Sequence, residues 1–318
     1  MTESLTIGVD IGGTKVAAGL VNASGAISSK VRVPMVATAD AATGFAAVRD
    51  AVEAVYAVCP EARGAVKGIG ICSPGPLDPN TGVVLNPPNL PCWRGFPLGA
   101  ETEKAFGVPA RVDNDANAAG LAEVLWGAGI GYRDVFYATL GTGIGTGIIF
   151  DKKIYHGRTG LAAEGGHMTI DLNGPRCGCG KPGCAEILCA GPAIAVRARA
   201  KLAGGGASRM LELAGGDLKQ LRAEHVGEAY REGDKLATEV LQETAHLLAV
   251  WLGNIVDLLE PEIMVVGGGV SDLMSSFFPA IIADLPGCSI NPRATEIPLI
   301  KARYGADSGI AGAAALCF

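Results

Sequence analysis

Four side chains of types that bind metal ions lie close together near the middle of the sequence. Cys177, Cys179 and Cys184 form the pattern C-x-C-x4-C, and His167 stands ten residues before the first of them. Three thiolates and one imidazole complete a tetrahedral ligand set for Zn²⁺, and a site closed by four protein ligands leaves no position for water. The spacing therefore predicts a structural zinc ion.

The cysteines also allow other interpretations. The sequence contains nine cysteines, an odd number, and Cys189 lies just beyond the compact group, where it could replace one ligand. Free structural thiols or an iron–sulfur site are further alternatives. Clustering in a long chain without a secretion signal favours a metal over disulfides.

Two glutamates flank the predicted metal site. Glu164 lies three residues before His167, and Glu186 lies two residues after Cys184. A metal that fixes the backbone would hold both carboxylates rigidly, and rigid carboxylates suit paired hydrogen bonds to the neighbouring hydroxyls of a sugar. For either glutamate taken alone, a solvated position in a polar loop is the preferred explanation, and only their place on both sides of the metal site favours sugar binding.

A glycine-containing turn near the start of the chain has the composition of a phosphate-binding loop. Glycines let backbone N–H groups approach an anion, while a threonine hydroxyl and a lysine add contacts and charge. An aspartate at the end of the preceding strand could hold Mg²⁺ directly or through water. An ordinary hairpin turn is the alternative. The residues are Asp10, Gly12, Gly13, Thr14 and Lys15.

A second turn, residues 141–147, has four glycines and two threonines, including Gly141, Thr142 and Gly143. It lacks the Gly-Lys-Ser/Thr ending of a Walker A motif, and a strand rather than a helix follows it. Two such turns predict one nucleotide held from both sides. Gly268 and Gly269 follow a buried strand and could lie against adenine, although a helix-entry turn is the commoner explanation.

The tripeptide Asp113-Asn114-Asp115 precedes a predicted helix. Such residues often cap helices, and three in a row exceed what one cap requires. We predict that Asp115 accepts a proton from a substrate hydroxyl while Asn114 holds a neighbouring hydroxyl. Because the transition state of phosphoryl transfer is loose, an aspartate of ordinary pKa suffices for this role.

The elements around these motifs alternate between strands and helices. Strand–turn–strand patterns at residues 5–21 and 135–150 form a weak internal repeat, which predicts two α/β halves around a cleft. We expect a small domain from 1–118 plus 305–318, and a large domain with the zinc knuckle from 119–304. Further strands are expected at 30–36, 66–72, 110–112 and 262–266, a loop at 73–97, and helices at 41–58, 116–126, much of 192–260, and 307–318.

The composition excludes several classes of protein. With 318 residues, 49% hydrophobic and 18% charged, the chain is neither disordered, coiled-coil nor collagen-like. A net charge of −6 argues against general nucleic-acid binding. The apolar stretch 247–266 includes Asn254, Asp257 and Glu260, which argue against a membrane span. The first residues do not form a basic leader, so we expect a cytoplasmic protein.

Taken together, the motifs resemble the ROK family of sugar kinases and repressors, within the superfamily of sugar kinases, actin and chaperone ATPases. The resemblance covers nearly the whole chain and implies an α/β, two-domain actin-like ATPase (ribonuclease H-like) fold with a cleft between the domains. The motifs that carry it are EGGH (164–167), CGCGKPGCAE (177–186), DIGGTK (10–15), SPGPLD (73–78), NLPCW (89–93), DNDANAA (113–119), GTGIGTG (141–147) and GGGV (267–270).

The resemblance also implies roles for single residues. Asp115 corresponds to the catalytic base. The two turns correspond to phosphate motifs, and Gly268 and Gly269 to part of the adenosine site. The histidine of this family both coordinates Zn²⁺ and meets the sugar through its other nitrogen. The implied sugar-binding residues are Gly75, Asn89, Asn114, Glu164, His167 and Glu186.

The implied activity is ATP-dependent phosphorylation of a hexose, most of all glucose. The implied cofactors are Mg²⁺ and a structural Zn²⁺. The resemblance further implies a homodimer that binds neither nucleic acid nor a membrane. Repressors of this family carry an N-terminal helix-turn-helix, for which no room precedes the first strand, so a kinase is favoured. The alternatives are a kinase for N-acetylglucosamine, N-acetylmannosamine, fructose or mannose, a non-catalytic sugar-responsive regulator, or a zinc-dependent nucleic-acid module.

Overall fold

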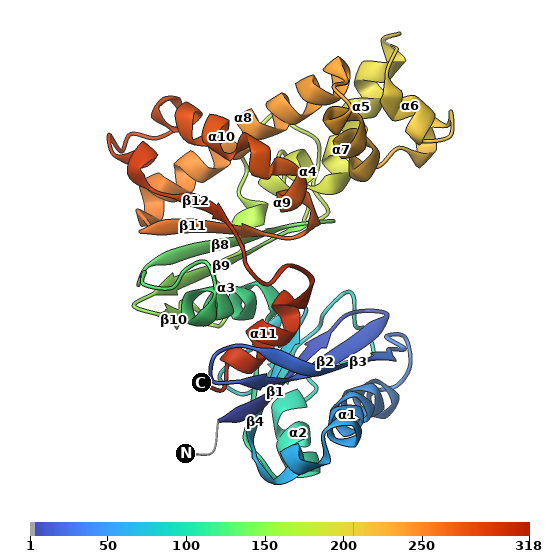
Figure 1. The fold of residues 1–318 in the computed structure, drawn as a ribbon, viewed down its shortest axis with the longest axis vertical. Helices are drawn as coiled ribbons and strands as arrows, with labels where there is room; N and C mark the ends of the chain where they lie inside the picture. The colour runs from blue at the N-terminus through green and yellow to red at the C-terminus, as the bar shows by residue number, and fades with distance from the viewer. Residues whose placement is uncertain (1–3, 206) are drawn as a thin grey trace. The chain divides into compact units, whose positions relative to one another are not determined.

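The computed structural model describes residues 4–205 and 207–318 (Figure 1). Three of the five strands in the first sheet run parallel, which sets the position of the polar residues at their ends. The sheet has the order β3-β2-β1-β4-β7. β1 pairs with β2 antiparallel and with β4 parallel, and β4 pairs with β7 parallel. The strands are β1 (Leu5–Ile11), β2 (Lys15–Asn22), β3 (Ile27–Pro34), β4 (Val66–Ser73) and β7 (Ala110–Asn114).

The predicted helices around this sheet are present. α1 (Ala41–Val58) begins at Asp40, whose side chain accepts a hydrogen bond from the backbone N–H of Thr43. α3 (Asp115–Trp126) follows β7 directly, and α11 (Ser308–Ala315) contacts α3, β1 and β4. Gly70 in β4 permits this close contact, because a Cβ atom there would lie 1.7 Å from the carbonyl oxygen of Ala313.

The second sheet repeats the topology of the first. Its order is β10-β9-β8-β11-β12, with β9 and β10 antiparallel and β11 and β12 parallel. Each strand therefore has a counterpart at the same place in the first sheet, and the internal repeat predicted from the two hairpins is confirmed. The strands are β8 (Val135–Leu140), β9 (Ile144–Phe150), β10 (Lys153–Ile154), β11 (Ile263–Gly267) and β12 (Leu299–Lys301).

The segment predicted to be mostly helical contains a series of helices that ends in the long α8. Trp251 of α8 is fully buried, and its indole N–H donates to the carbonyl oxygen of Gly165 at 3.0 Å. The helices are α4 (Ala185–Cys189), α5 (Gly191–Ala203), α6 (Arg209–Leu213), α7 (Ala223–Arg231) and α8 (Lys235–Leu259), followed beyond β11 by α9 (Gly269–Met274) and α10 (Phe278–Asp284).

Two elements differ from the sequence-based expectation. The predicted loop 73–97 contains the short antiparallel strands β5 (Leu77–Asp78) and β6 (Val83–Val84). The helix α2 (Leu98–Phe106), which ends at the left-handed Gly107, was not predicted from the sequence. Strands of two residues have no periodicity that a sequence pattern could reveal.

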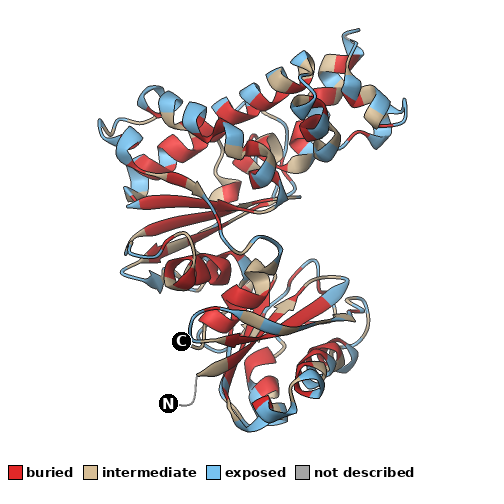
Figure 2. Cartoon of the chain, in the orientation of Figure 1, coloured by how far each residue is buried: buried red, intermediate tan, exposed pale blue. Residues whose placement is uncertain are grey.

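The described chain forms two compact units. It passes from one unit to the other at 137/138, 146/147, 163/164 and 302/303. The first unit holds the first sheet with α3 and α11, and the second holds residues 138–146 and 164–302. Most strands and the inner faces of the helices are buried in each unit, whereas alternate residues of the edge strand β3 are exposed (Figure 2). The predicted folding domains, 1–118 with 305–318 and 119–304, stay a prediction.

Among the described residues, no helix is both long and apolar enough to cross a membrane. The expectation about the start of the chain concerns residues 1–4, of which 1–3 lie outside the described part.

Candidate active site

Strand register brings two of the predicted motifs to one edge of the first sheet. Asp10 of β1 pairs with Cys72 of β4, and Cys72 pairs with Asp113 of β7. The carboxyl ends of these three parallel strands therefore lie side by side, which is where α/β sheets bind ligands. The first glycine turn leaves this edge after Asp10, and Asn114 and Asp115 leave it after Asp113.

Asp10 lies in an environment that disfavours its negative charge. Burial, followed by the negative charge of Asp115, raises the pKa of Asp10 from 3.8 to about 6, while the charge of Lys15 opposes this shift. A buried carboxylate near a second carboxylate is stabilised by a cation, and Mg²⁺ prefers such hard oxygen ligands. The donor set at Asp10 therefore fits a magnesium ion.

The first turn is short and open at its tip. The N–H of Gly12 donates to the carbonyl oxygen of Lys15 at 2.9 Å, and Thr14 and Lys15 are exposed. A Cβ atom on Gly13 would lie 3.3 Å from the carbonyl oxygen of Asn89. The loop that carries Asn89 thus passes beside the turn, and the exposed tip leaves a hydroxyl and an ammonium group available to a phosphate.

Asn114 caps α3 as the capping interpretation predicted. Its Oδ1 accepts the N–H of Ala116 at 2.9 Å, and Oδ1 of Asp115 accepts the same N–H at 2.8 Å. The amide nitrogen of Asn114 lies 3.7 Å from the position of a Cβ on Gly75. Gly75 and Asn114 are therefore neighbours, and the exposed Asp115 sits at the first position of the helix.

Sequence reasoning missed a partner of this segment. Nε2 of His156, which follows β10, lies 2.6 Å from Oδ2 of Asp113. The two residues are 43 positions apart, and His156 stands in no motif, so only the folded chain brings them together.

The second turn is held by residues of the predicted sugar site. The N–H of Ile144 donates to Oε2 of Glu186 at 3.0 Å, and the N–H of Gly165 donates to the buried Thr146 hydroxyl at 2.9 Å. A Cβ on Gly143 would lie 2.6 Å from the same carboxylate oxygen of Glu186, so only glycine fits there without displacing it.

A pocket of about 760 Å³ in the second unit lies against this turn. Gly141, Thr142 and Gly269, which the sequence predicts for a nucleotide site, line this pocket. Gly268 adjoins it with a φ of 85°, and a Cβ at that position would lie 2.3 Å from the carbonyl oxygen of Leu140. The volume is that of a typical small-molecule or cofactor site. The lining residues that the sequence did not indicate include Pro192, Arg199, Arg222, Arg231 and Leu273.

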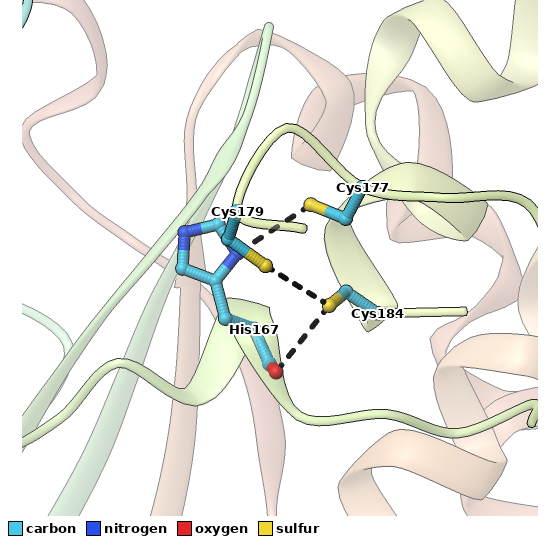
Figure 3. Close-up of side chains that lie close together, drawn as sticks. All are labelled: His167, Cys177, Cys179 and Cys184. Atoms are coloured by element: carbon cyan, nitrogen blue, oxygen red, sulfur yellow. Dashed lines mark hydrogen bonds between the residues drawn. The ribbon is translucent and has the colours of Figure 1, made fainter. Parts of the chain in front are cut away.

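The four predicted zinc ligands converge in the second unit (Figure 3). Their ligand atoms all lie within 4.8 Å of one another. Nδ1 of His167 is 3.7 Å from Sγ of Cys177, and the sulfur atoms of Cys179 and Cys184 are 3.6 Å apart. A tetrahedral site with Zn–S bonds of about 2.3 Å requires ligand separations of about 3.8 Å. The geometry and the donor types fit zinc.

The acidity of the thiols differs within the cluster. Burial raises the pKa of Cys177, and raises that of Cys184 to about 12, so neither thiol ionises readily at neutral pH unless a cation replaces its proton. A backbone hydrogen bond from Lys181 lowers the pKa of Cys179. Cys189 is buried but is not part of the group.

Glu186 and Glu164 meet this cluster differently. Oε1 of Glu186 lies 3.9 Å from Nδ1 of His167 and 3.7 Å from Sγ of Cys177. Glu164 is exposed, and its carbonyl oxygen accepts the N–H of His167 at 3.0 Å. With Nδ1 of His167 directed to the cysteines, Nε2 on the other side of the ring is the nitrogen left for a substrate.

The chain is similar to known proteins over almost its full length. The sequence pattern of the ROK family matches residues 6–318. Glucokinase from Streptomyces coelicolor is 36% identical over 318 residues, covering 98% of this chain and 97% of that protein. N-acetylmannosamine kinase from Escherichia coli is 33% identical over 311 residues, covering 98% of this chain and 97% of that protein.

A crystal structure of a ROK family glucokinase from Streptomyces griseus in complex with glucose and AMPPNP is 37% identical, with a TM-score of 0.77 and coverage of 98% of this chain and 99% of that one. The likeness confirms the predicted α/β class and the two-domain actin-like ATPase fold. Since the family pattern spans all but the first five residues, the chain belongs to the ROK family.

Proposed function

We propose that the chain is a glucokinase, which transfers the γ-phosphoryl group of ATP to the primary hydroxyl of glucose with Asp115 as general base. The coarser activity is shown: the chain is an ATP-dependent sugar kinase of the ROK family. Glucose as the hexose, the metal ions and the role of each residue belong to the proposal.

Asp115 is the proposed base because it is exposed at the first position of α3, beside the capping Asn114. As the primary hydroxyl oxygen attacks the γ-phosphorus, its proton passes to the Asp115 carboxylate. The bond between the γ-phosphorus and the β–γ bridging oxygen breaks, and ADP leaves. Positioning and neutralisation of charge, more than base strength, accelerate such a loose transition state.

The two glycine turns are the proposed phosphate-binding elements. Residues 12–15 and 141–143 offer backbone N–H groups and the hydroxyls of Thr14 and Thr142. The 760 Å³ pocket is the proposed adenosine site, with Gly268 and Gly269 against the base. Asp10 would hold Mg²⁺, which neutralises charge on the phosphates when bound.

The residues proposed to bind the sugar are those that the family resemblance implies, which are Gly75, Asn89, Asn114, Glu164, His167 and Glu186. A structural Zn²⁺ held by His167, Cys177, Cys179 and Cys184 would fix the ring of His167 so that Nε2 meets a sugar hydroxyl.

The observation that carries the proposal is the register of Asp10, Cys72 and Asp113 across three parallel strands. It brings the first phosphate turn and the proposed base to one edge of a single sheet. Replacing Asp115 by Ala is expected to reduce kcat at least about a thousandfold while glucose still binds by calorimetry. Retained turnover in this variant would refute the role of Asp115.

The similarity to an N-acetylmannosamine kinase supports a second candidate substrate. A panel of glucose, mannose, fructose, N-acetylglucosamine and N-acetylmannosamine, assayed by coupled detection of ADP, separates these hexoses. The highest kcat/KM for glucose is expected. A chain that binds sugar but releases no ADP with any of them would instead support the sugar-responsive regulator. The homodimer and the cytoplasmic location stay predictions.

A further inference from the structure

Asp113 is a buried carboxylate at the junction between β7 and the segment that carries the proposed base. Asp113 is only 3% exposed to solvent. A buried carboxylate needs hydrogen-bond donors for both oxygens, because each unpaired oxygen loses the hydration that it has in water. The donors around Asp113 therefore determine how the segment is held.

Both oxygens of this carboxylate have donors. Oδ1 accepts the backbone N–H of Asn114 at 2.7 Å and the side-chain amide of Asn117 at 3.1 Å. Oδ2 lies 2.6 Å from Nε2 of His156. A carboxylate only accepts, so Nε2 must carry a proton, in the neutral or the charged imidazole.

We propose that His156 is a positioning residue for catalysis: by donating to Asp113, it fixes the carboxylate that holds the backbone of Asn114, and with it the cap from which Asp115 projects. The inference rests on the proposed function, in which Asn114 binds the sugar and Asp115 is the base. It adds a residue that contacts neither substrate.

The geometry makes this link short. His156 contacts Asp113, Asp113 contacts the N–H of Asn114, and Asn114 accepts the N–H of Ala116 in the first turn of α3. Loss of the His156 donor leaves Oδ2 in a buried site without its partner, so the carboxylate rotates or admits water. Either change displaces the N–H of Asn114.

The hydrogen bond to Asp113 also raises the pKa of His156 above its usual value. The charged groups that share its cavity of about 360 Å³ are Asp113 and Arg111 of β7, and Lys152 and Lys153 of the β9–β10 hairpin. The three cations oppose protonation of the imidazole, whereas Asp113 favours it. Of these charged groups, Asp113 is the one that makes a direct contact with His156.

The test compares His156→Gln with His156→Leu. The amide nitrogen of Gln reaches the position of Nε2 and can donate to Asp113, whereas Leu fills similar volume without a donor. For H156L we expect a loss in kcat/KM for the sugar of at least about tenfold, with KM for ATP changed less than about twofold, because misplaced catalytic groups slow the reaction without altering distant binding. For H156Q we expect recovery to within about threefold of wild type.

The kinetic pattern supplies a readout that loss of folded protein would not produce. A fall in kcat/KM for the sugar with KM for ATP nearly unchanged, and its rescue by a Gln that restores only the donor to Asp113, point to positioning of Asn114 and Asp115. A matched control is His246→Leu, which removes a histidine–aspartate contact of 3.3 Å with Asp284 in which both side chains are exposed. This control should keep wild-type kinetics.

Thermal unfolding of each variant shows whether it is folded at the assay temperature. If H156L keeps wild-type kcat/KM, or if H156Q and H156L are equally impaired while folded, the proposal is overturned. Calorimetric titration with the sugar distinguishes this from failure of the proposed base. If Asp115→Ala stays active, the base is wrong, yet weaker sugar binding in H156L and its recovery in H156Q still support positioning of Asn114.

Discussion

Glu186 accepts a hydrogen bond from the backbone N–H of Ile144, with 3.0 Å between Oε2 and the nitrogen. Its other oxygen lies 3.7 Å from Sγ of Cys177 and 3.9 Å from Nδ1 of His167. One carboxylate thus joins the second glycine turn to the metal cluster within the second unit. The Glu186 side chain therefore links the proposed phosphate-binding turn to the proposed sugar-binding residue His167.

The metal cluster is expected to support sugar binding. Cys179→Ser removes one thiolate, and the remaining ligands bind Zn²⁺ more weakly. We expect the purified variant to lose most of its zinc, measured by elemental analysis, and its sugar affinity to fall by at least about tenfold, since partners that orient metal ligands are worth about 10- to 100-fold.

Cys288→Ser is the matched control, because Cys288 lies outside the cluster. It should keep both zinc and affinity. A wild-type protein that contains no zinc when purified without chelators would contradict the assignment of the site.

The negative charge of Glu186 is expected to matter more for the sugar than for ATP. Glu186→Gln keeps an oxygen that can accept the N–H of Ile144 but removes the charge near the metal ligands. Steady-state kinetics should show a higher KM for the sugar, by about tenfold or more, because hydrogen bonds to charged groups are about twice as strong as neutral ones. The exposed Glu228→Gln on α7 serves as the control.

An equal rise in the KM of ATP and of the sugar in E186Q would instead assign Glu186 to the phosphate turn alone. An unchanged KM for both substrates would remove it from the site.

Gly268 is expected to tolerate no side chain. Its φ is 85°, and a Cβ would lie 2.3 Å from the backbone oxygen of Leu140, which cannot rotate away. Gly268→Ala should therefore destabilise the protein by about 2 kcal/mol or more, seen as a lower Tm.

Gly269→Ala is the comparison, because a Cβ at that position would have no described neighbour within 4 Å apart from the adjoining backbone of α9. It should keep the Tm of the wild type. Equal Tm values for the two variants would show that the contact at Gly268 relaxes without cost.

The negative charge of the buried Asp10 is expected to lower the free energy of unfolding when no Mg²⁺ or nucleotide is bound. Its folded pKa of about 6 exceeds the usual 3.8, so the folded state binds more protons than the unfolded state between about pH 4 and pH 6. Stability therefore falls as the pH rises through this window, by at most about 3 kcal/mol from this group.

Asp10→Asn removes the charge. The variant should be more stable than the wild type at pH 7.5 by denaturant unfolding, inactive as a kinase, and less dependent on pH between 4 and 6. Lower stability of D10N at pH 7.5 would contradict the assignment of burial as the cause of the raised pKa.

The sequence by itself determined the features that depend on short spacing along the chain. The pattern Cys177-x-Cys179-x4-Cys184 sets the loop that presents the sulfur atoms, and two apolar runs on either side of a glycine turn set β1 and β2. The cap at Asn114 likewise needs only the N–H of Ala116, two residues away. Neighbours so close are held by covalent geometry, so residue types and spacing suffice to predict them.

Only the tertiary structure decided which distant residues meet. The register of Asp10, Cys72 and Asp113 depends on how three parallel strands pair, and His156 reaches Asp113 across 43 positions. Arg199 and Arg231 join the lining of the 760 Å³ pocket, the proposed adenosine site, from separate helices. Such contacts arise from packing of whole elements against each other, and the local sequence around each residue carries no record of its partner.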